Sequence, residues 1–171
     1  MHGAGTKPGT TINNGQVRCL DLTRLISRVG RRMTGVDRVE MAYLTRFVEL
    51  GDPLFAIART SLGYVLLDRL GTTAIAERLI ANEWPRRDML SLLRNRATPD
   101  RQRAETALRQ HAMARCRPPG RARMIAKHIP GDARYFNVGH SNLSRRMLDA
   151  FAHTRRIVMI HDTIPLDHPE Y

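Results

Sequence analysis

Apolar residues along the chain follow two different spacings, and the changes between them predict strands and helices. Short apolar runs predict strands at Val17–Leu22, Arg134–Val138 and Ile157–Ile160. The last run is wholly apolar, which is typical of a strand that is buried on both faces within a parallel sheet. Two further runs, Leu54–Arg59 and Tyr64–Asp68, are separated by a short turn and predict a hairpin.

Helical spacing is clearest after Thr34. Apolar side chains recur there at steps of three and four residues, on one face of a helix, at Val36, Val39, Tyr43, Phe47 and Leu50. Thr34 fits the N-cap of this helix, with Asp37 as its capping-box partner three residues later. Gly51 is a typical residue to end it.

Weaker patterns predict the remaining segments. Further helical segments are expected over 72–81, 86–96, 99–115 and 142–153. Thr98 and Ser141 fit the N-cap positions of the last two. The prolines and glycines of 117–132 predict a loop, and 23–33 is expected to be a simple connection.

This order of elements places the chain in the α/β class. Apart from the hairpin, strands alternate with helices, which favours a Rossmann-like, doubly wound, mostly parallel sheet with helices on both faces. We expect one such domain over 17–171, after a disordered Gly/Thr/Asn-rich segment at 1–16. In such a sheet the fourth parallel unit returns beside the first strand, so the loops 30–37, 139–142 and 161–168 are expected to meet.

The loop before the clearest helix is a candidate binding segment. Thr34 and Gly35 stand at a helix start, where free backbone N–H groups favour an anion. Arg38 adds a bidentate donor for a phosphate or a carboxylate. The alternative is that Thr34 and Gly35 only form a capping turn.

Histidines follow the last two predicted strands. His140 and Asn142 belong to a polar cluster that is placed to contact a sugar hydroxyl, although a local helix cap is the alternative. His161 directly follows the closing strand, where it can act as an acid, a base or a hydrogen-bond donor. Asp162 can fix the tautomer of His161 or cap the next turn. His161 and Asp162 are therefore the candidate catalytic residues.

Neither a metal site nor a disulfide is predicted. His161 and His168 are seven residues apart, and no CxxC or HExxH spacing supports them as metal ligands. No cofactor is expected either. Cys19 lies in a predicted strand and Cys116 at a predicted helix end, and we expect two unreactive thiols.

The net charge of +12 invites a nucleic-acid hypothesis. The basic residues are almost all arginines, scattered along the chain with few aromatic residues between them, so platforms for base stacking are missing. Nucleic acid is therefore an unlikely partner on this pattern. A basic module that binds nucleic acid or an anionic membrane surface stays the alternative interpretation.

No apolar run approaches the roughly 18 residues of a membrane-spanning helix. The N-terminus also lacks the apolar core of a secretory signal. The expected location is cytoplasmic, with peripheral contact at the inner membrane face as an option.

Four segments carry a resemblance to a known family. They are CLDLTRLISR (19–28), TGVDRVEMAY (34–43), RYFNVGHSNL (134–143) and RIVMIHDTIPLDHPEY (156–171). Together they resemble the N-terminal half of bacterial glycosyltransferases of family 4, which have the GT-B architecture. The resemblance covers most of the chain and is weakest between residues 60 and 130.

The resemblance implies two Rossmann-like domains that face each other across a cleft. The N-terminal domain would hold a glycan or lipid-linked acceptor, and the C-terminal domain would bind the nucleotide-sugar donor. Such enzymes usually retain the anomeric configuration, need no metal and serve cell-envelope polysaccharide synthesis. The resemblance places the Thr34–Arg38 loop near the donor diphosphate or the acceptor, and His161 near the donor sugar.

Residues 1–171 contain no counterpart of the family's C-terminal domain, with its basic residues and glutamate-bearing motif for the donor. We therefore expect this chain to correspond to an incomplete GT-B half. On its own it is expected to bind the donor poorly and to be inactive.

Overall fold

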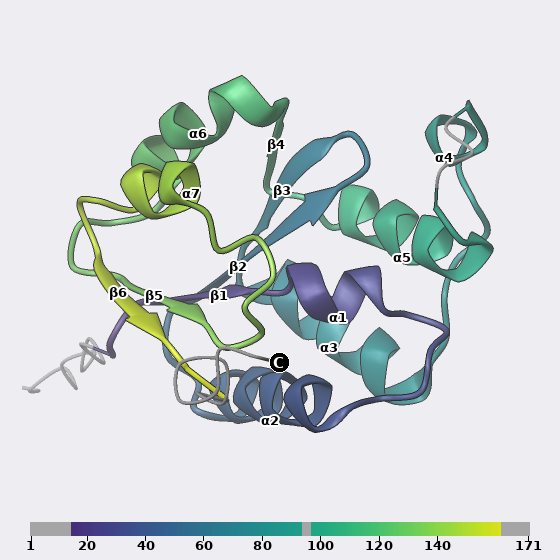
Figure 1. The fold of residues 1–171 in the computed structure, drawn as a ribbon, viewed down its shortest axis with the longest axis horizontal. Helices are drawn as coiled ribbons and strands as arrows, with labels where there is room; N and C mark the ends of the chain where they lie inside the picture. Colours follow the sequence, from purple (N-terminus) through teal and green to yellow (C-terminus); the bar gives the residue numbers. More distant parts are fainter. Residues whose placement is uncertain (1–14, 94–96, 162–171) are drawn as a thin grey trace, which may run out of the picture.

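The computed structural model describes residues 15–93 and 97–161, and one mixed sheet forms the centre of the fold (Figure 1). Its strands lie in the order β4-β3-β2-β1-β5-β6. They are β1 (Arg18–Asp21), β2 (Leu54–Thr60), β3 (Gly63–Leu67), β4 (Ala114–Cys116), β5 (Arg134–Asn137) and β6 (Arg155–Val158). Strands β2, β1, β5 and β6 are parallel, whereas β3 pairs antiparallel with both β2 and β4. The α/β class and the β2–β3 hairpin are confirmed.

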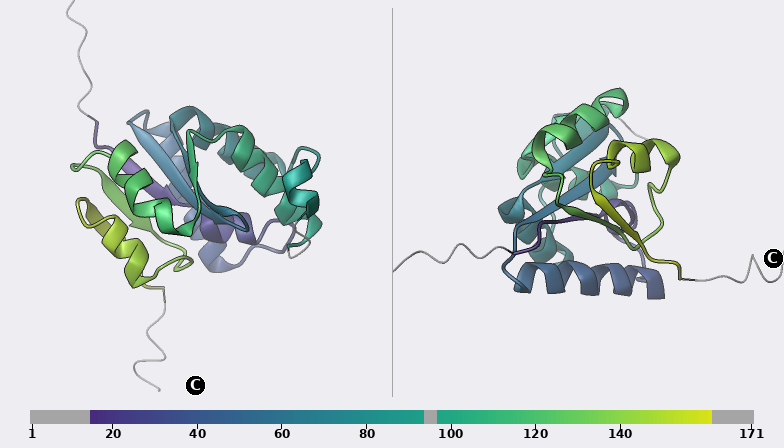
Figure 2. Two further views of the ribbon diagram at one scale, coloured as in Figure 1. Left: turned by 90° about the horizontal axis from the view of Figure 1, so that it is seen from above. Right: turned by 90° about the vertical axis from the view of Figure 1, so that its left-hand side faces the viewer.

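Helices pack along the sheet on both of its sides (Figure 1, Figure 2). They are α1 (Thr23–Ser27), α2 (Gly35–Glu49), α3 (Arg69–Ala81), α4 (Met89–Leu93), α5 (Pro99–Gln110), α6 (Arg121–His128) and α7 (Arg145–Ala150). One apolar cluster joins the sheet to α1, α2, α3 and α5, and a second joins it to α6 and α7. Among the described helices, none has the length and apolar character needed to cross a membrane.

Strand β1 lies between these two layers and is buried on both faces. Cys19 belongs to the cluster beneath α6 and α7, while the next residue, Leu20, belongs to the opposite cluster. Both side chains have no exposed surface. A pleated strand covered by helices on both sides requires this alternation, because successive side chains point to opposite faces.

The closing strand differs from its prediction. Strand β6 pairs only with β5 in the described sheet, so it forms an edge. Val158 is 37% exposed and Ile160, just beyond the strand, is 69% exposed. The prediction of burial on both faces was therefore wrong, because an apolar, β-branched run indicates a strand without telling a central strand from an edge strand.

Helix α2 confirms the predicted capping box. The hydroxyl of Thr34 accepts a hydrogen bond from the backbone N–H of Asp37, and the carboxylate of Asp37 accepts one from the backbone N–H of Thr34. The predicted inner face is rotated, however. The buried side chains of α2 are Asp37, Glu40, Leu44 and Phe47. A count of apolar positions missed this face, because two carboxylates occupy its N-terminal half.

The prediction for residues 110–132 was also wrong in part. Helix α5 ends at Gln110 instead of running to 115, and Ala114–Cys116 forms strand β4 at the sheet edge. The predicted loop 117–132 contains α6, which follows a 3₁₀ turn at Pro118–Gly120. Prolines in that turn stand where a helix begins, a position at which a missing N–H costs little.

Two smaller predictions also differ from the structure. The connection expected at 23–33 contains the short helix α1. Helix α7 begins later than expected, because the side chain of Ser144, not Ser141, accepts the capping hydrogen bond from Met147. Both cysteines are free thiols as predicted, with Cys116 in a strand, and burial raises the pKa of the Cys19 thiol well above its usual range.

The hairpin offers a stability test at Gly63. Gly63 has φ of 137°, and an added Cβ would overlap the backbone carbonyl oxygen of Cys116 on the neighbouring strand. Gly63→Ala should lower the free energy of unfolding by about 2–4 kcal/mol in urea titrations, because a paired backbone cannot move away. Gly35→Ala is the matched control: no atom lies within 4 Å of its added Cβ, and it should change stability by less than about 0.5 kcal/mol. Equal effects would contradict this account.

Candidate functional site

Several polar side chains meet at the carboxyl ends of the parallel strands. From β1 the chain runs to β2 on one side, while β5 lies on the other side of β1, so the strand order reverses between β1 and β5. Open α/β sheets bind ligands beyond the strand ends at such a switch point. Asp21 ends β1, Asn137 ends β5, and His161 follows β6 by three residues. The fold therefore places these three at the position where a ligand is expected.

Asp21 is the most heavily bonded side chain of this group. Its Oδ2 accepts hydrogen bonds from the hydroxyl of Tyr135 at 2.8 Å and from Nδ2 of Asn142 at 3.0 Å. Its Oδ1 accepts the backbone N–H of Thr23 at 2.9 Å. Burial raises the pKa of Asp21 above its usual range, and these hydrogen bonds oppose that rise. A carboxyl group at 3% exposure thus anchors the loop of Asn142 to the end of β1.

Two asparagines complete this polar cluster. The Oδ1 of Asn142 accepts a hydrogen bond from the hydroxyl of Tyr64 at 3.1 Å, and its backbone is left-handed, with φ of 63°. Nδ2 of Asn137 donates to the hydroxyl of Tyr135 and to the carbonyl oxygen of Ser141. Oδ1 of Asn137 is buried without a hydrogen-bond partner in the described structure. The loop is thus tied to β1, β3 and β5, and one acceptor remains unused.

The two candidate histidines lie edge to face. The ring centroids of His140 and His161 are 5.3 Å apart. Nε2 of His140 contacts the carbonyl oxygen of Met159, and Nε2 of His161 contacts the carbonyl oxygen of Val138. A carbonyl oxygen only accepts, so Nε2 is the donor in each contact, which leaves Nδ1 as the acceptor of a ring that carries one proton. These crossed contacts hold the end of β6 against the loop that follows β5.

Arg24 links the start of α2 to this loop. Its guanidinium donates to Oδ1 of Asp37 at 2.7 Å, and Arg28 donates to Oδ2 of the same carboxylate at 2.9 Å. The methylene stem of Arg24 lies against Gly139 so closely that a Cβ at Gly139 would stand 3.0 Å from it. Although burial alone would raise it, hydrogen bonds from Thr34, Arg24 and Arg28 lower the pKa of Asp37 to about 2. An ionised Asp37 therefore fixes Arg24 between the two loops.

The predicted binding segment at 34–38 is a capping turn with open space around it. Thr34 and Asp37 form the capping box, as the alternative interpretation held. Gly35 has no atom within 4 Å of the position of an added Cβ, so its backbone is approachable from outside. Arg38 is exposed one turn into α2. The capping role and the binding role are thus compatible.

Glu40 is a buried carboxyl group behind the 139–142 loop. It has no exposed surface, and neither carboxyl oxygen has a hydrogen-bond partner of normal geometry in the described structure. An added Cβ at Gly139 would overlap Oε2 of Glu40, so a larger residue there would displace the Glu40 carboxyl group. Burial, and secondarily the charge of Asp21, raises the pKa of Glu40 to about 9, although the backbone N–H of Leu25 and the charge of Arg24 oppose this. Glu40 is therefore neutral at pH 7.

The structure brings some of the predicted site residues together, while two others lie apart from them. His140, Asn142 and His161 lie in one cluster at the strand ends. Thr34 connects to that cluster through the side chain of Arg24. Gly35 and Arg38 lie at the start of α2 without a described contact to it, and Asp162 falls outside the described residues.

Sequence reasoning missed four residues on which this geometry depends. They are Asp21, Arg24, Glu40 and Tyr135. Asp21 had a signal of another kind, because it is a carboxylate inside the predicted strand Val17–Leu22. Arg24 and Glu40 carried no local signal, because an arginine among many and a glutamate on a helix are usually solvated.

The site offers hydroxyl, amide, imidazole and guanidinium groups. Among residues 15–93 and 97–161, no group of three or more His, Cys, Asp or Glu side chains is arranged to hold a metal ion. Such a mixture of donors and acceptors suits a polar, hydroxyl-rich ligand with a nearby negative charge.

Comparison with known proteins gives no assignment. No protein-family model, no curated protein and no solved structure matches this chain. The resemblance of the four segments therefore remains a hypothesis, and the function has to be argued from the chemistry of the site.

Asp37 provides a test of how the site is held. Asp37→Ala removes the capping box and leaves Arg24 and Arg28 without their carboxylate, which should cost about 2–4 kcal/mol of unfolding free energy at pH 7. Because the folded pKa of about 2 lies below the unfolded value, the contribution of Asp37 is present above pH 4 and is lost as the pH falls to 2. Urea titrations from pH 7 to pH 3 measure both effects. Glu49→Ala, which breaks the exposed pair with Arg46, should cost less than about 0.5 kcal/mol.

Glu40 provides a test with the opposite pH dependence. Its pKa is 4.5 in the ordinary state and about 9 in the fold, so the unfolded chain loses the proton first as the pH rises. The stability of the wild-type protein relative to Glu40→Gln should therefore fall between pH 5 and pH 9, by at most about 1.4 kcal/mol per pH unit. Urea titrations at pH 5, 7 and 9 measure this difference. Glu77→Gln, at an exposed position of α3, should show no such trend, and a flat difference for Glu40→Gln would contradict its burial as a neutral acid.

Proposed function

We propose that this chain is the acceptor-side domain of a glycosyltransferase that uses a nucleotide-sugar, with the doubly wound, Rossmann-like topology of one GT-B half. The observation that carries the proposal is the polar cluster at the β1–β5 switch point. His140 and His161 lie edge to face there, beside a loop that Tyr64 and Asp21 hold through Asn142.

The cluster has the chemistry that a sugar ligand requires. Sugar hydroxyl groups both donate and accept, so they are recognised by groups such as the Nδ1 atoms of His140 and His161. A preorganised set of such groups costs little to reorder on binding. We propose that His161 contacts the donor sugar in the complete site and that Asn142 orients the loop for the acceptor.

The start of α2 has the chemistry for the departing diphosphate. The first N–H groups of a helix favour an anion, and α2 is 15 residues long. Arg38 is exposed there, and Arg24 stands between this helix start and the histidine loop. In glycosyl transfer the transition state is oxocarbenium-like and negative charge develops on the leaving group, so fixed cationic donors stabilise it.

The alternative of a nucleic-acid module gains little support from the described structure. Its aromatic side chains are all buried or half-buried, so no described aromatic ring is available to stack on a base. The positive charge remains, and it would give weak, salt-sensitive binding to any polyanion.

The test is ligand binding by the purified 171-residue chain. Saturation-transfer NMR with a panel of oligosaccharides and nucleotide-sugars should detect glycan binding, with little or no sugar transfer from a radiolabelled donor. His161→Ala should reduce the glycan signal at least fivefold while leaving the melting temperature within about 3 °C. His128→Ala, at the end of α6, is the matched control and should leave the signal unchanged.

Two outcomes would contradict the proposal. One is the absence of binding to every glycan in the panel by a folded chain. The other is duplex-DNA binding that is tighter than any glycan binding and falls steeply with salt, which would favour the basic module.

A further inference from the structure

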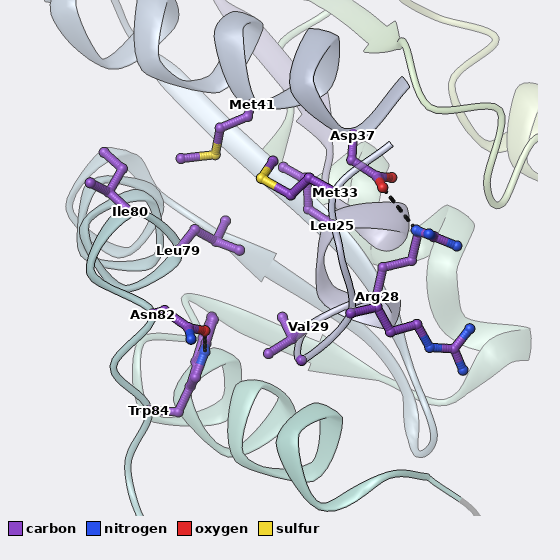
Figure 3. Close-up of a pocket in the computed structure, with 12 residues that line it drawn as sticks. Leu25, Arg28, Val29, Met33, Asp37, Met41, Leu79, Ile80, Asn82 and Trp84 are labelled. Atoms are coloured by element: carbon purple, nitrogen blue, oxygen red, sulfur yellow. Dashed lines mark hydrogen bonds and ion pairs between the residues drawn. The ribbon is translucent and has the colours of Figure 1, made fainter. Parts of the chain in front are cut away.

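A cavity lies apart from the histidine cluster, and its walls are mainly apolar. It has a volume of about 590 Å³ and lies between the segment after α1, the start of α2 and the C-terminal half of α3 (Figure 3). Its apolar lining includes Leu25, Val29, Met33, Met41, Leu79 and Trp84. In Figure 3 these side chains surround one common space, with Arg28 and Asp37 toward one end.

The exposure of this lining indicates that something covers it. Met33 is 43% exposed and Ile80, which also borders the cavity, is 65% exposed. Removal of such apolar surface from water is favourable. Two methionine side chains in the wall make it adaptable, because a flexible thioether chain can fit ligands of slightly different shape.

One end of the cavity is positively charged. Asp37 is the acidic residue in its lining, and its carboxylate is already bonded by Arg24, Arg28 and Thr34. Arg31 lines the cavity, is exposed, and has no acidic partner among the described residues.

One further carboxylate lies near this end and does not reverse its charge. Asp100 approaches Gly30 from outside the cavity, and it pairs with Arg103 at 3.6 Å. The end near Arg31 therefore retains positive charge, which favours a negatively charged group.

The volume limits the occupant to a single chain. A methylene needs about as much space as a water molecule, roughly 30 Å³, so the cavity volume corresponds to about 20 methylenes, and a chain of about 12–16 carbons fits within it. A three-turn helix about 10 Å wide would need roughly 1,000 Å³ or more, well above the cavity volume. A partner helix is thus too large to enter.

We propose that this cavity binds the apolar chain of an anionic, single-chain amphiphile and holds its phosphate or carboxylate head group at Arg31. The inference goes beyond the proposed function, because it requires no sugar transfer and uses none of the histidine cluster. It gives the protein a second ligand class, in a place that shares Asp37 with the first site as a structural link.

Trp84 makes the proposal directly testable, because it is the only tryptophan in the chain and it lines the cavity. Dodecyl phosphate with a brominated chain, kept below its micellar concentration, should quench the fluorescence of Trp84 saturably. In a series of octyl, decyl and dodecyl phosphates, affinity should rise about tenfold for every two carbons. Inorganic phosphate should not bind, and dodecanol should bind at least fivefold more weakly than dodecyl phosphate. The affinity for dodecanoate compares a carboxylate head group with a phosphate head group.

Two pairs of variants distinguish binding in the cavity from nonspecific adsorption to the protein surface. Ile80→Gln should weaken binding at least fivefold, whereas Leu70→Gln, on the same helix at 80% exposure and outside the cavity, should not. Arg31→Gln should weaken the binding of dodecyl phosphate but not that of dodecanol. Arg123→Gln on α6 should weaken the binding of neither ligand.

Three results would overturn the proposal. They are the absence of quenching, an affinity independent of chain length, and equal effects of Ile80→Gln and Leu70→Gln. If the protein bound anionic vesicles but the monomeric amphiphile did not quench Trp84, the binding would be a surface contact and not a cavity site. Equal loss in Arg31→Gln and Arg123→Gln would remove the head-group assignment.

Discussion

The carboxylate of Asp37 is the contact on which both candidate sites depend. It holds Arg24 and Arg28 at 2.7 and 2.9 Å, and with Thr34 it caps α2. Arg24 lies within α1 and Arg28 directly follows it, so one carboxylate joins this short helix to the start of the next helix. Arg24 then packs on Gly139 at the histidine loop, and Arg28 lines the apolar cavity. Because Asp37 is 3% exposed at its side chain, water competes little for these bonds.

Buried acids set the character of the strand ends. Asp21 is satisfied by three hydrogen bonds, whereas Glu40 is deeply buried with little hydrogen bonding, and the charge of Asp21 further disfavours a charge on Glu40. A protein retains unsatisfied buried groups at a cost of about 1–3 kcal/mol each. Such costs concentrate at functional sites, where strain and polarity serve binding. Because the buried carboxyl groups lie at the β1–β5 switch point, we place the proposed function there and not in the apolar cavity.

Local patterns predicted the elements that depend on local forces. The capping box of Thr34 and Asp37 lies within four residues, and the strand at Arg134–Asn137 follows from its own apolar residues. What could not be predicted depends on partners far away in sequence. The edge position of β6 is decided by what pairs with it, and the inward turn of Glu40 is decided by the space beneath Gly139. Of the candidate site, the histidines were found because they follow strands, but Arg24 and Tyr135 act through contacts that no spacing in the sequence reveals.

The central claim is that His140 and His161 form one ligand site at the switch point. Long-range ¹H–¹⁵N spectra of the imidazole rings, recorded with and without a bound oligosaccharide, test it most directly. The account predicts that both rings carry their proton on Nε2 and that both sets of ring signals shift together on titration, while those of His128 stay unchanged. A proton on Nδ1 in the free protein, or a shift at His128 without one at His140 and His161, would contradict it.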